Sequence, residues 1–265
     1  MRILLTNDDG IRAPGIIALH NALEGLGELV VFAPETVQSA MSHGITYTKP
    51  LMIQKVDVTD SMTGIAVDGR PADCVKLAMR TLWEERFGEG ETPDLTISGL
   101  NSGANVGINI IYSGTVAAAI ESAFLGVPAI AVSLYLNNRD SICYDRAAEI
   151  ARVVIDRILE NKLESHEVIN VNIPVCETPD MPVPEVKVVD MNAAGDLGHY
   201  DKRESPDGRT YYWAAGSGMS FAHTAEGSDV EALKQGYATV TPLNYVLTDT
   251  NRMSVWKERL KIDKC

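Results

Sequence analysis

The sequence has few cysteines and a deficit of basic residues. Its four cysteines share no C-x-x-C spacing, which argues against a disulfide framework or a zinc site and favours a reducing compartment. Because 23 Lys and Arg stand against 36 Asp and Glu, the net charge is −13, and this sign argues against binding along nucleic-acid backbones or anionic lipid surfaces. A small phosphorylated ligand is not excluded, since one bound cation can reverse the local field.

Long apolar runs are also lacking. No segment approaches the roughly 20 consecutive apolar residues that a membrane helix needs. The N-terminus does not resemble a signal peptide, because Thr6, Asn7 and Asp8 follow only three apolar residues. We therefore expect a cytoplasmic protein without a membrane partner.

Short apolar runs alternate with helical patterns over the first 183 residues. The runs that predict strands are 3–5, 29–33, 94–98, 129–133 and 168–173. The segments that predict helices are 15–26, 71–82, 116–125 and 144–159. This alternation with short connections predicts an α/β fold, a doubly wound sheet with helices on both faces.

The pattern changes after residue 183. Two strand-like runs flank the turn sequence 205–209, in which Pro presets φ and Gly accepts a positive φ. The aromatic run 211–213 then predicts a hairpin arm that needs a packing partner, such as another subunit. We predict three parts: a core at 1–183, a hairpin extension that returns to the core at 184–243, and a C-terminal arm at 244–265 that ends in a helix.

Two adjacent carboxylates, Asp8 and Asp9, follow the first predicted strand, and Gly10 lets the chain turn after them. In an open α/β sheet, ligands bind just beyond the carboxyl ends of parallel strands. Two acids at that place are suited to hold a hard cation such as Mg²⁺ or Mn²⁺. A solvated turn with a helix-capping acid explains the same residues, because acid-glycine pairs are common in turns.

A segment rich in Gly, Asn and Ser leads into the predicted helix at 116–125. Glycines let the backbone approach a ligand closely, and Asn can offer an oxygen to a metal or an N–H to a phosphate. Ser113, Gly114 and Thr115 directly precede the helix, whose free N–H groups form a natural phosphate site. The alternative is a flexible loop with Thr115 as the helix N-cap. Neither a P-loop nor a G-x-G-x-x-G dinucleotide motif is present.

A weaker signal lies after the second predicted strand, in the segment 38–44. Its hydroxyl groups and His43 could add a metal ligand and a titrating group, although a loop without function gives the same pattern. The other four histidines show no spacing typical of a metal pair, and we expect them to be structural or exposed: His20, His166, His199 and His223.

Taken together, these motifs resemble the SurE family of metal-dependent nucleoside 5′-monophosphate phosphatases. The matching motifs are T-N-D-D-G at 6–10, G-R-P-A-D-C-V at 69–75, S-G-L-N-S-G-A-N at 98–105, Y-S-G-T-V-A-A-A at 112–119, V-N-I-P at 171–174 and the segments 208–213 and 229–243. The resemblance covers nearly the whole chain. One departure is E-T-V-Q-S-A at 35–40, where the family more often has D-R-x-x-S-G.

The resemblance implies a Rossmann-like, mostly parallel sheet with a projecting β-hairpin, and a C-terminal arm used in homodimers or homotetramers. It also implies one Mg²⁺ or Mn²⁺ ion per subunit. The positions that match its metal ligands are Asp8, Asp9, Ser39 and Asn101. The positions that match its phosphate contacts are Asn105, Ser113, Gly114 and Thr115.

The expected function is hydrolysis of nucleoside 5′-monophosphates, with 3′-monophosphates as further substrates. Asp8, Asp9 and Asn105 are the expected catalytic residues, and His43 is a candidate general acid. The sequence does not decide which acid accepts a proton from water.

Three other functions compete with this one. An aspartyl-phosphate mechanism needs a second Asp two residues after the first, a spacing that Asp8 and Asp9 do not have. A nucleotide-sugar transferase shares the phosphate and acid features, but no sugar-binding acid cluster is evident. A noncatalytic nucleotide-binding module could use the same fold, because fold does not determine function.

Overall fold

A mixed sheet of nine strands forms the centre of the protein, in the computed structural model that describes residues 1–195, 197–215 and 218–262. The strand order is β3-β4-β2-β1-β5-β6-β7-β11-β8, and the antiparallel neighbours are β3 with β4 and β7 with β11. The strands are β1 (Arg2–Thr6), β2 (Glu28–Pro34), β3 (Ile53–Asp57), β4 (Thr63–Val67), β5 (Leu95–Ser102), β6 (Ala129–Leu134), β7 (Val168–Ile173), β8 (Val186–Val188) and β11 (Ala238–Leu243).

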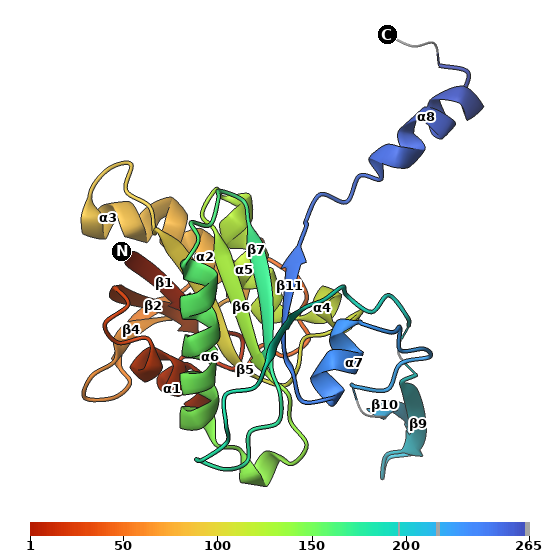
Figure 1. The fold of residues 1–265 in the computed structure, drawn as a ribbon, viewed down its shortest axis with the longest axis horizontal. Helices are drawn as coiled ribbons and strands as arrows, with labels where there is room; N and C mark the ends of the chain where they lie inside the picture. Colours follow the sequence, from red (N-terminus) through yellow and green to blue (C-terminus); the bar gives the residue numbers. More distant parts are fainter. Residues whose placement is uncertain (196, 216–217, 263–265) are drawn as a thin grey trace.

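Helices cover both faces of this sheet (Figure 1). Helices α1 (Pro14–Ala22) and α6 (Tyr144–Leu159) pack together on one face, and α2 (Pro71–Leu77) and α5 (Gly114–Phe124) on the other. The remaining helical segments are a π-helical turn (Ala78–Leu82), α3 (Trp83–Phe87), α4 (Asn109–Tyr112), a 3₁₀ turn (Arg139–Ser141), α7 (Asp229–Lys234) and α8 (Thr250–Arg259). The predicted doubly wound, mostly parallel α/β fold is confirmed.

The two faces of the sheet differ in polarity. Alternate residues of β5, β6 and β7 point toward α1 and α6 and form the main apolar core, with Ile97, Val132 and Val171 fully buried. The opposite face carries buried polar side chains near its carboxyl edge, among them Ser133, Asn170 and Asn172. Because buried polar groups need hydrogen-bond partners, this second face determines much of the local structure around the site.

Two sequence predictions need correction at helix ends. Helix α1 ends at Ala22 rather than near Leu26, because the chain turns after it and Gly25 adopts a φ of +79°. Helix α5 begins at Gly114, two residues earlier than predicted, and its N-cap is Ser113, whose hydroxyl accepts the N–H of Val116. Thr115 is therefore not the cap.

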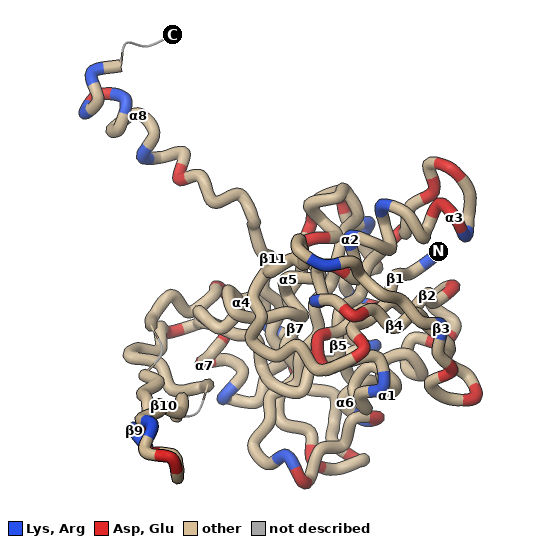
Figure 2. Tube along the Cα trace, turned by 180° about the vertical axis from the view of Figure 1, so that it is seen from behind, with Lys and Arg blue, Asp and Glu red and all other residues tan. Residues whose placement is uncertain are grey.

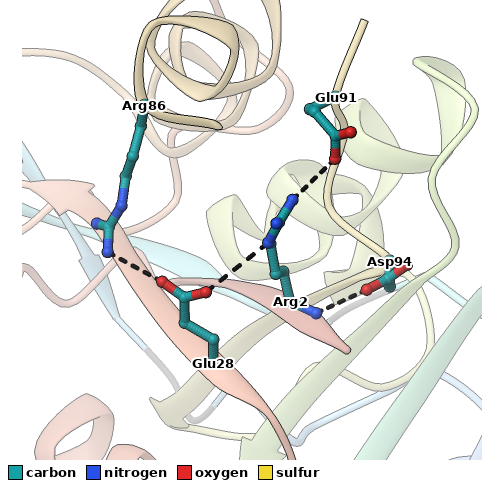
Figure 3. A network of polar contacts seen from close by, with 5 residues as sticks. All are labelled: Arg2, Glu28, Arg86, Glu91 and Asp94. Carbon is teal, nitrogen blue, oxygen red and sulfur yellow. Dashed lines mark hydrogen bonds and ion pairs between the residues drawn. The ribbon is translucent and has the colours of Figure 1, made fainter. Parts of the chain in front are cut away.

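Ion pairs join the amino ends of β1 and β2 to the segment before β5 (Figure 3). Arg2 contacts Glu91 at 2.8 Å and Glu28 at 3.7 Å, and Arg86 contacts Glu28 at 3.1 Å. The main-chain N–H of Arg2 also donates to Asp94 at 2.6 Å. These side chains are exposed, so each pair contributes at most about 1 kcal/mol. The network lies at the amino ends of these parallel strands, at the opposite end of the sheet from their carboxyl ends.

Two extensions leave the core (Figure 1). Strands β9 (His199–Glu204) and β10 (Thr210–Ala215) form the predicted hairpin, and α8 lies at the end of the predicted C-terminal arm. Every residue of α8 is exposed, and residues 263–265, including Cys265, lie outside the described residues. In the described part of the chain, no helix is both long and apolar enough to cross a membrane.

Candidate functional site

Asp8 and Asp9 lie just past the carboxyl end of β1, at the place where the strand order reverses. β2 follows β1 in sequence and lies on one side of it, whereas β5 lies on the other side. Ligands of doubly wound sheets bind in the crevice at this switch point. The fold thus places the adjacent carboxylates where a ligand site is expected.

Asp8 is buried against the first turn of α5. Its Oδ1 accepts a hydrogen bond from the Thr115 hydroxyl at 2.6 Å, and the residue is only 5 % exposed. A Cβ on Gly114 would lie 2.9 Å from the Cβ of Asp8, so only glycine allows this approach. Burial first and the charge of Asp9 second raise the pKa of Asp8 to about 6, although the Thr115 hydrogen bond lowers it.

Asp9 joins the turn after β1 to the carboxyl end of β5. Its Oδ2 accepts the main-chain N–H of Ser102 at 2.9 Å. The neighbouring Asn101 donates its side-chain amide to the Gly103 carbonyl at 2.6 Å, so its Oδ1 is left without a hydrogen bond within the described residues. Asn101 directly precedes Ser102, the residue that contacts Asp9.

Asn105 is held by side chains from two other strands. Asn172 on β7 accepts the N–H of Asn105 at 2.8 Å and donates to its carbonyl at 3.1 Å. Asn170 donates to the same carbonyl at 2.8 Å, and the side-chain amide of Asn105 donates to Ser133 on β6 at 2.8 Å. An amide nitrogen carries two hydrogens, so one donor of Asn105 remains for a ligand.

Ser39 lies at the start of a loop that crosses the site. The N–H of Gln38 donates to the main-chain carbonyl of Asp8 at 2.8 Å, and the N–H of Ser42 donates to the carbonyl of Tyr112 at 3.0 Å. Ser39 itself is exposed. The two main-chain contacts therefore bring the predicted ligand close to Asp8 and leave its hydroxyl open.

His43 contacts a buried acid on α5 rather than the carboxylates of β1. Its Nε2 lies 2.7 Å from Oε2 of Glu121, and Nζ of Lys76 lies 3.6 Å from Oε1. Burial alone raises the pKa of Glu121, but the His43 hydrogen bond and the charge of Lys76 together lower it below its ordinary value. Glu121 is six residues beyond Thr115, roughly 9 Å along the helix axis.

Three of the four residues predicted to hold phosphate, Ser113, Gly114 and Thr115, form the N-cap and the start of α5. The hydroxyl of Ser113 caps the helix, and that of Thr115 donates to Asp8. Both hydroxyls are therefore already used inside the protein. The N–H of Val116 in the first helical turn is also used, because it donates to Ser113. The N–H groups of Gly114 and Thr115 remain the main-chain groups suited to an anion.

The predicted metal ligands form a set of oxygen donors with uncompensated negative charge. Within the described residues, no Lys, Arg or His lies within ion-pair distance of Asp8 or Asp9. Two carboxylates, the free Oδ1 of Asn101 and the open hydroxyl of Ser39 are the ligand types that Mg²⁺ and Mn²⁺ prefer. The described residues contain no cluster of three or more His, Cys, Asp and Glu suited to a metal. The proposed set does not meet that criterion, because only two of its four residues are acids and the others are Ser39 and Asn101.

Sequence patterns missed the residues that support Asn105. Ser133, Asn170 and Asn172 are fully buried polar residues within apolar strands. The alternation in the run V-I-N-V-N-I at 168–173 was the available signal. Two Asn on the same face of a buried strand need partners, and a nearby loop supplies them.

Comparisons with known proteins identify the family. The family model described as survival protein SurE matches residues 3–195. A protein named 5′-nucleotidase SurE from Rhodopirellula baltica is 45% identical over 258 residues, covering 97% of this chain and 98% of that protein. Its namesake from Carboxydothermus hydrogenoformans is 40% identical over 270 residues and covers 98% of both chains.

A solved structure agrees with these matches. The crystal structure of SurE protein from Aquifex aeolicus has a TM-score of 0.81 and 36% sequence identity, and the match covers 98% of this chain and all of that one. The family model and these relatives extend over most of the chain. The chain therefore belongs to the SurE family.

Proposed function

We propose that this protein is a divalent-metal-dependent 5′-nucleotidase that hydrolyses nucleoside 5′-monophosphates to nucleoside and phosphate. The observation that carries the proposal is the uncompensated Asp8–Asp9 pair, packed against the amino end of α5. Relatives named 5′-nucleotidase support it. No observation favours the noncatalytic alternative.

The proposed metal site consists of Asp8, Asp9, Ser39 and Asn101. When bound, Mg²⁺ or Mn²⁺ supplies positive charge that offsets the charge of the phosphate oxygens and lowers the pKa of a water molecule. Ser102 holds the carboxylate of Asp9 at 2.9 Å, and Thr115 holds that of Asp8. The acids are thus oriented before any ligand arrives.

The protein also holds the phosphate itself in this proposal. The N–H groups at the start of α5 and the remaining amide hydrogen of Asn105 donate to its oxygens. One of the two aspartates accepts a proton from the attacking water, which must approach in line with the leaving oxygen. Nucleoside 3′-monophosphates fit the same requirements, because only the phosphate is held by these groups.

We place the enzyme in the cytoplasm and propose that it forms a homodimer or homotetramer. Cys74, Cys143 and Cys176 are free thiols, and their reduced state suits a reducing compartment. The exposed hairpin and α8 offer surfaces for a second copy. Figure 2 shows Lys and Arg scattered among Asp and Glu along the trace, so a long nucleic acid finds no basic track on the side that it shows.

Replacing Asp8 with Asn tests the function. Phosphate release from AMP should fall by orders of magnitude, because the substitution removes one of the two charges that attract the ion. The matched control is Asp156→Asn on the exposed face of α6, which should retain full activity. Near-wild-type release by the Asp8 variant, or release that persists after exhaustive chelation with EDTA, would refute the metal-dependent mechanism. Binding of AMP without phosphate release in Mg²⁺ or Mn²⁺ would favour the noncatalytic module.

A further inference from the structure

Arg70 is a half-buried cation without a partner. It lies in the turn between β4 and α2, and its guanidinium donates no hydrogen bond and forms no ion pair within the described residues. The guanidinium lies against the main chain of the loop that carries Ser39, where a Cβ on Gly44 would lie 2.1 Å from its terminal nitrogen. A guanidinium has five N–H donors, and leaving them unmatched in a partly buried place costs free energy that a ligand can recover.

Arg70 lines a cavity of about 420 Å³. The cavity also has Gln38, Thr46, Tyr47, Thr48 and Lys49 on its walls. A cavity of this size with polar groups that can orient a ligand is within the range of small-molecule sites.

The cavity borders the proposed phosphate site at two points. Gln38 lines it and donates its main-chain N–H to Asp8 at 2.8 Å. Pro71, the residue after Arg70, lies 3.0 Å from the Cβ position of Gly114 at the start of α5. A ligand whose phosphate lies at α5 can therefore extend toward Arg70.

The charges around the cavity are balanced. Lys49 pairs with Asp68 at 2.8 Å. The Asp73 carboxylate, which accepts the main-chain N–H groups of Thr46 and Arg70, is a second acid beside the cavity, although it forms no ion pair with the guanidinium. The cavity thus offers hydrogen-bond donors without excess positive charge, which suits a neutral group with acceptors better than a second phosphate.

A 6-oxopurine has the matching edge. Its O6 and N7 are adjacent acceptors that a guanidinium binds through two parallel hydrogen bonds, whereas adenine carries an amino donor at position 6. Tyr47 is 90% exposed at the cavity wall, and an aromatic ring of this kind can stack on any base. Among the residues that line the cavity, Arg70 alone carries a guanidinium.

We propose that this cavity receives the base of the nucleotide and that Arg70 makes the enzyme favour GMP and IMP over AMP. The inference rests on the proposed function and adds the substrate preference of the same site. Its decisive quantity is the ratio of kcat/KM for GMP to kcat/KM for AMP.

Steady-state phosphate release from GMP, IMP, AMP and p-nitrophenyl phosphate tests the inference, with the wild type, Arg70→Ala and Arg70→Lys. We expect the GMP to AMP ratio to fall about tenfold or more in both variants, because a bidentate pair discriminates by that amount and Lys lacks the planar fork. IMP should follow GMP, since it has the same O6 and N7. Activity on p-nitrophenyl phosphate, which has no base, should stay unchanged.

Two further variants check the geometry. Arg157→Ala, at an exposed position of α6, should leave the ratio unchanged. Gly44→Ala keeps the guanidinium but displaces it, and should lower the ratio in the same direction as Arg70→Ala. A ratio near one in the wild type, a ratio unaffected by either Arg70 variant, or an equal loss on all four substrates would overturn the inference.

A second measurement separates this inference from the proposed function. If the wild type releases no phosphate from any substrate, the proposed function fails, and calorimetric binding of GMP and AMP then tests the base preference directly. Loss of GMP preference in Arg70→Ala supports the inference in that case also, and equal binding of both nucleotides refutes it. Binding of adenosine 3′,5′-bisphosphate is measured in the same way. If Arg70→Ala weakens its binding but does not weaken the binding of GMP, the cavity holds a second phosphate and the inference fails.

Discussion

The side chain of Asn172 binds both polar main-chain groups of Asn105, accepting from its N–H at 2.8 Å and donating to its carbonyl at 3.1 Å. The contact joins strand β7 to the loop after β5, in which Asn105 is a proposed phosphate ligand. Because Asn172 is fully buried, water cannot replace these bonds when the side chain is removed. Asn172 thus positions Asn105 without belonging to the loop.

Asn172→Ala should lower kcat and destabilise the protein by about 1–3 kcal/mol, because the N–H of Asn105 loses its acceptor. The control is Asn170→Ala, which removes only one of two donors to the same carbonyl and should cost less in both respects. Steady-state kinetics and thermal unfolding of the two variants check the order. Equal effects, or a larger effect at Asn170, would contradict the positioning role.

Gly114→Ala should reduce phosphatase activity strongly. The new Cβ would lie 2.9 Å from Cβ of Asp8 and 3.0 Å from its Oδ2, so the carboxylate or the helix must move, at a cost of about 1–3 kcal/mol. Gly195→Ala, with nothing within 4 Å of its Cβ position, is the matched control and should behave as the wild type. Unchanged kinetics for Gly114→Ala would show that the close packing is not required.

Metal binding should be visible without any substrate. Mn²⁺ should raise the melting temperature of the wild type, since an ion that binds only the folded state stabilises it according to its concentration and Kd. Asp9→Asn should greatly reduce this increase, whereas Glu149→Gln on the exposed face of α6 should retain it. A full increase in the Asp9 variant would remove that carboxylate from the metal site.

The His43–Glu121 contact should make the stability of the protein depend on pH. The pKa of Glu121 is lowered from its ordinary value of 4.5, so its stabilising contribution is fully present above that value and is lost as the pH falls through the lower folded-state pKa. The melting temperature of Glu121→Gln should therefore lie below that of the wild type at higher pH, and the gap should narrow in acid.

Thermal unfolding from about pH 3.5 to about pH 6 measures this gap. Glu160→Gln, an exposed acid at the end of α6, is the control and should show no such narrowing. A gap that widens as the pH falls would contradict the sign. Activity of His43→Ala, measured alongside, tests His43 as a general acid, and unchanged kcat would remove it from that role.

Helix α8 should mediate association between copies. Its Met253, Val255 and Trp256 are exposed apolar side chains, an arrangement that is costly unless a partner covers it. We expect light scattering to give the mass of a dimer or tetramer for the wild type and a lower mass for Trp256→Glu. Lys257→Glu should keep the wild-type mass, and a monomeric wild type would refute the expectation.

The sequence predicts the local parts of this structure well and the distant contacts less well. Asp8 and Gly114 could both be placed near the carboxyl edge of the sheet. Asp8 follows a predicted strand, and Gly114 directly precedes a predicted helix. Asn172 could not be connected to Asn105, since a polar residue inside a strand does not show which loop it contacts. His43 and Glu121 are 78 positions apart, and no periodic pattern relates them.

Strand β1 comes from the first six residues, yet it lies between β2 and β5 in the middle of the sheet. The acid that follows it is separated by 107 positions from the threonine that contacts it. During synthesis on the ribosome, the two carboxylates therefore emerge long before the helix that completes their surroundings. A nascent chain holds this pair of charges in water, and the finished pocket can form only after most of the core has left the exit tunnel.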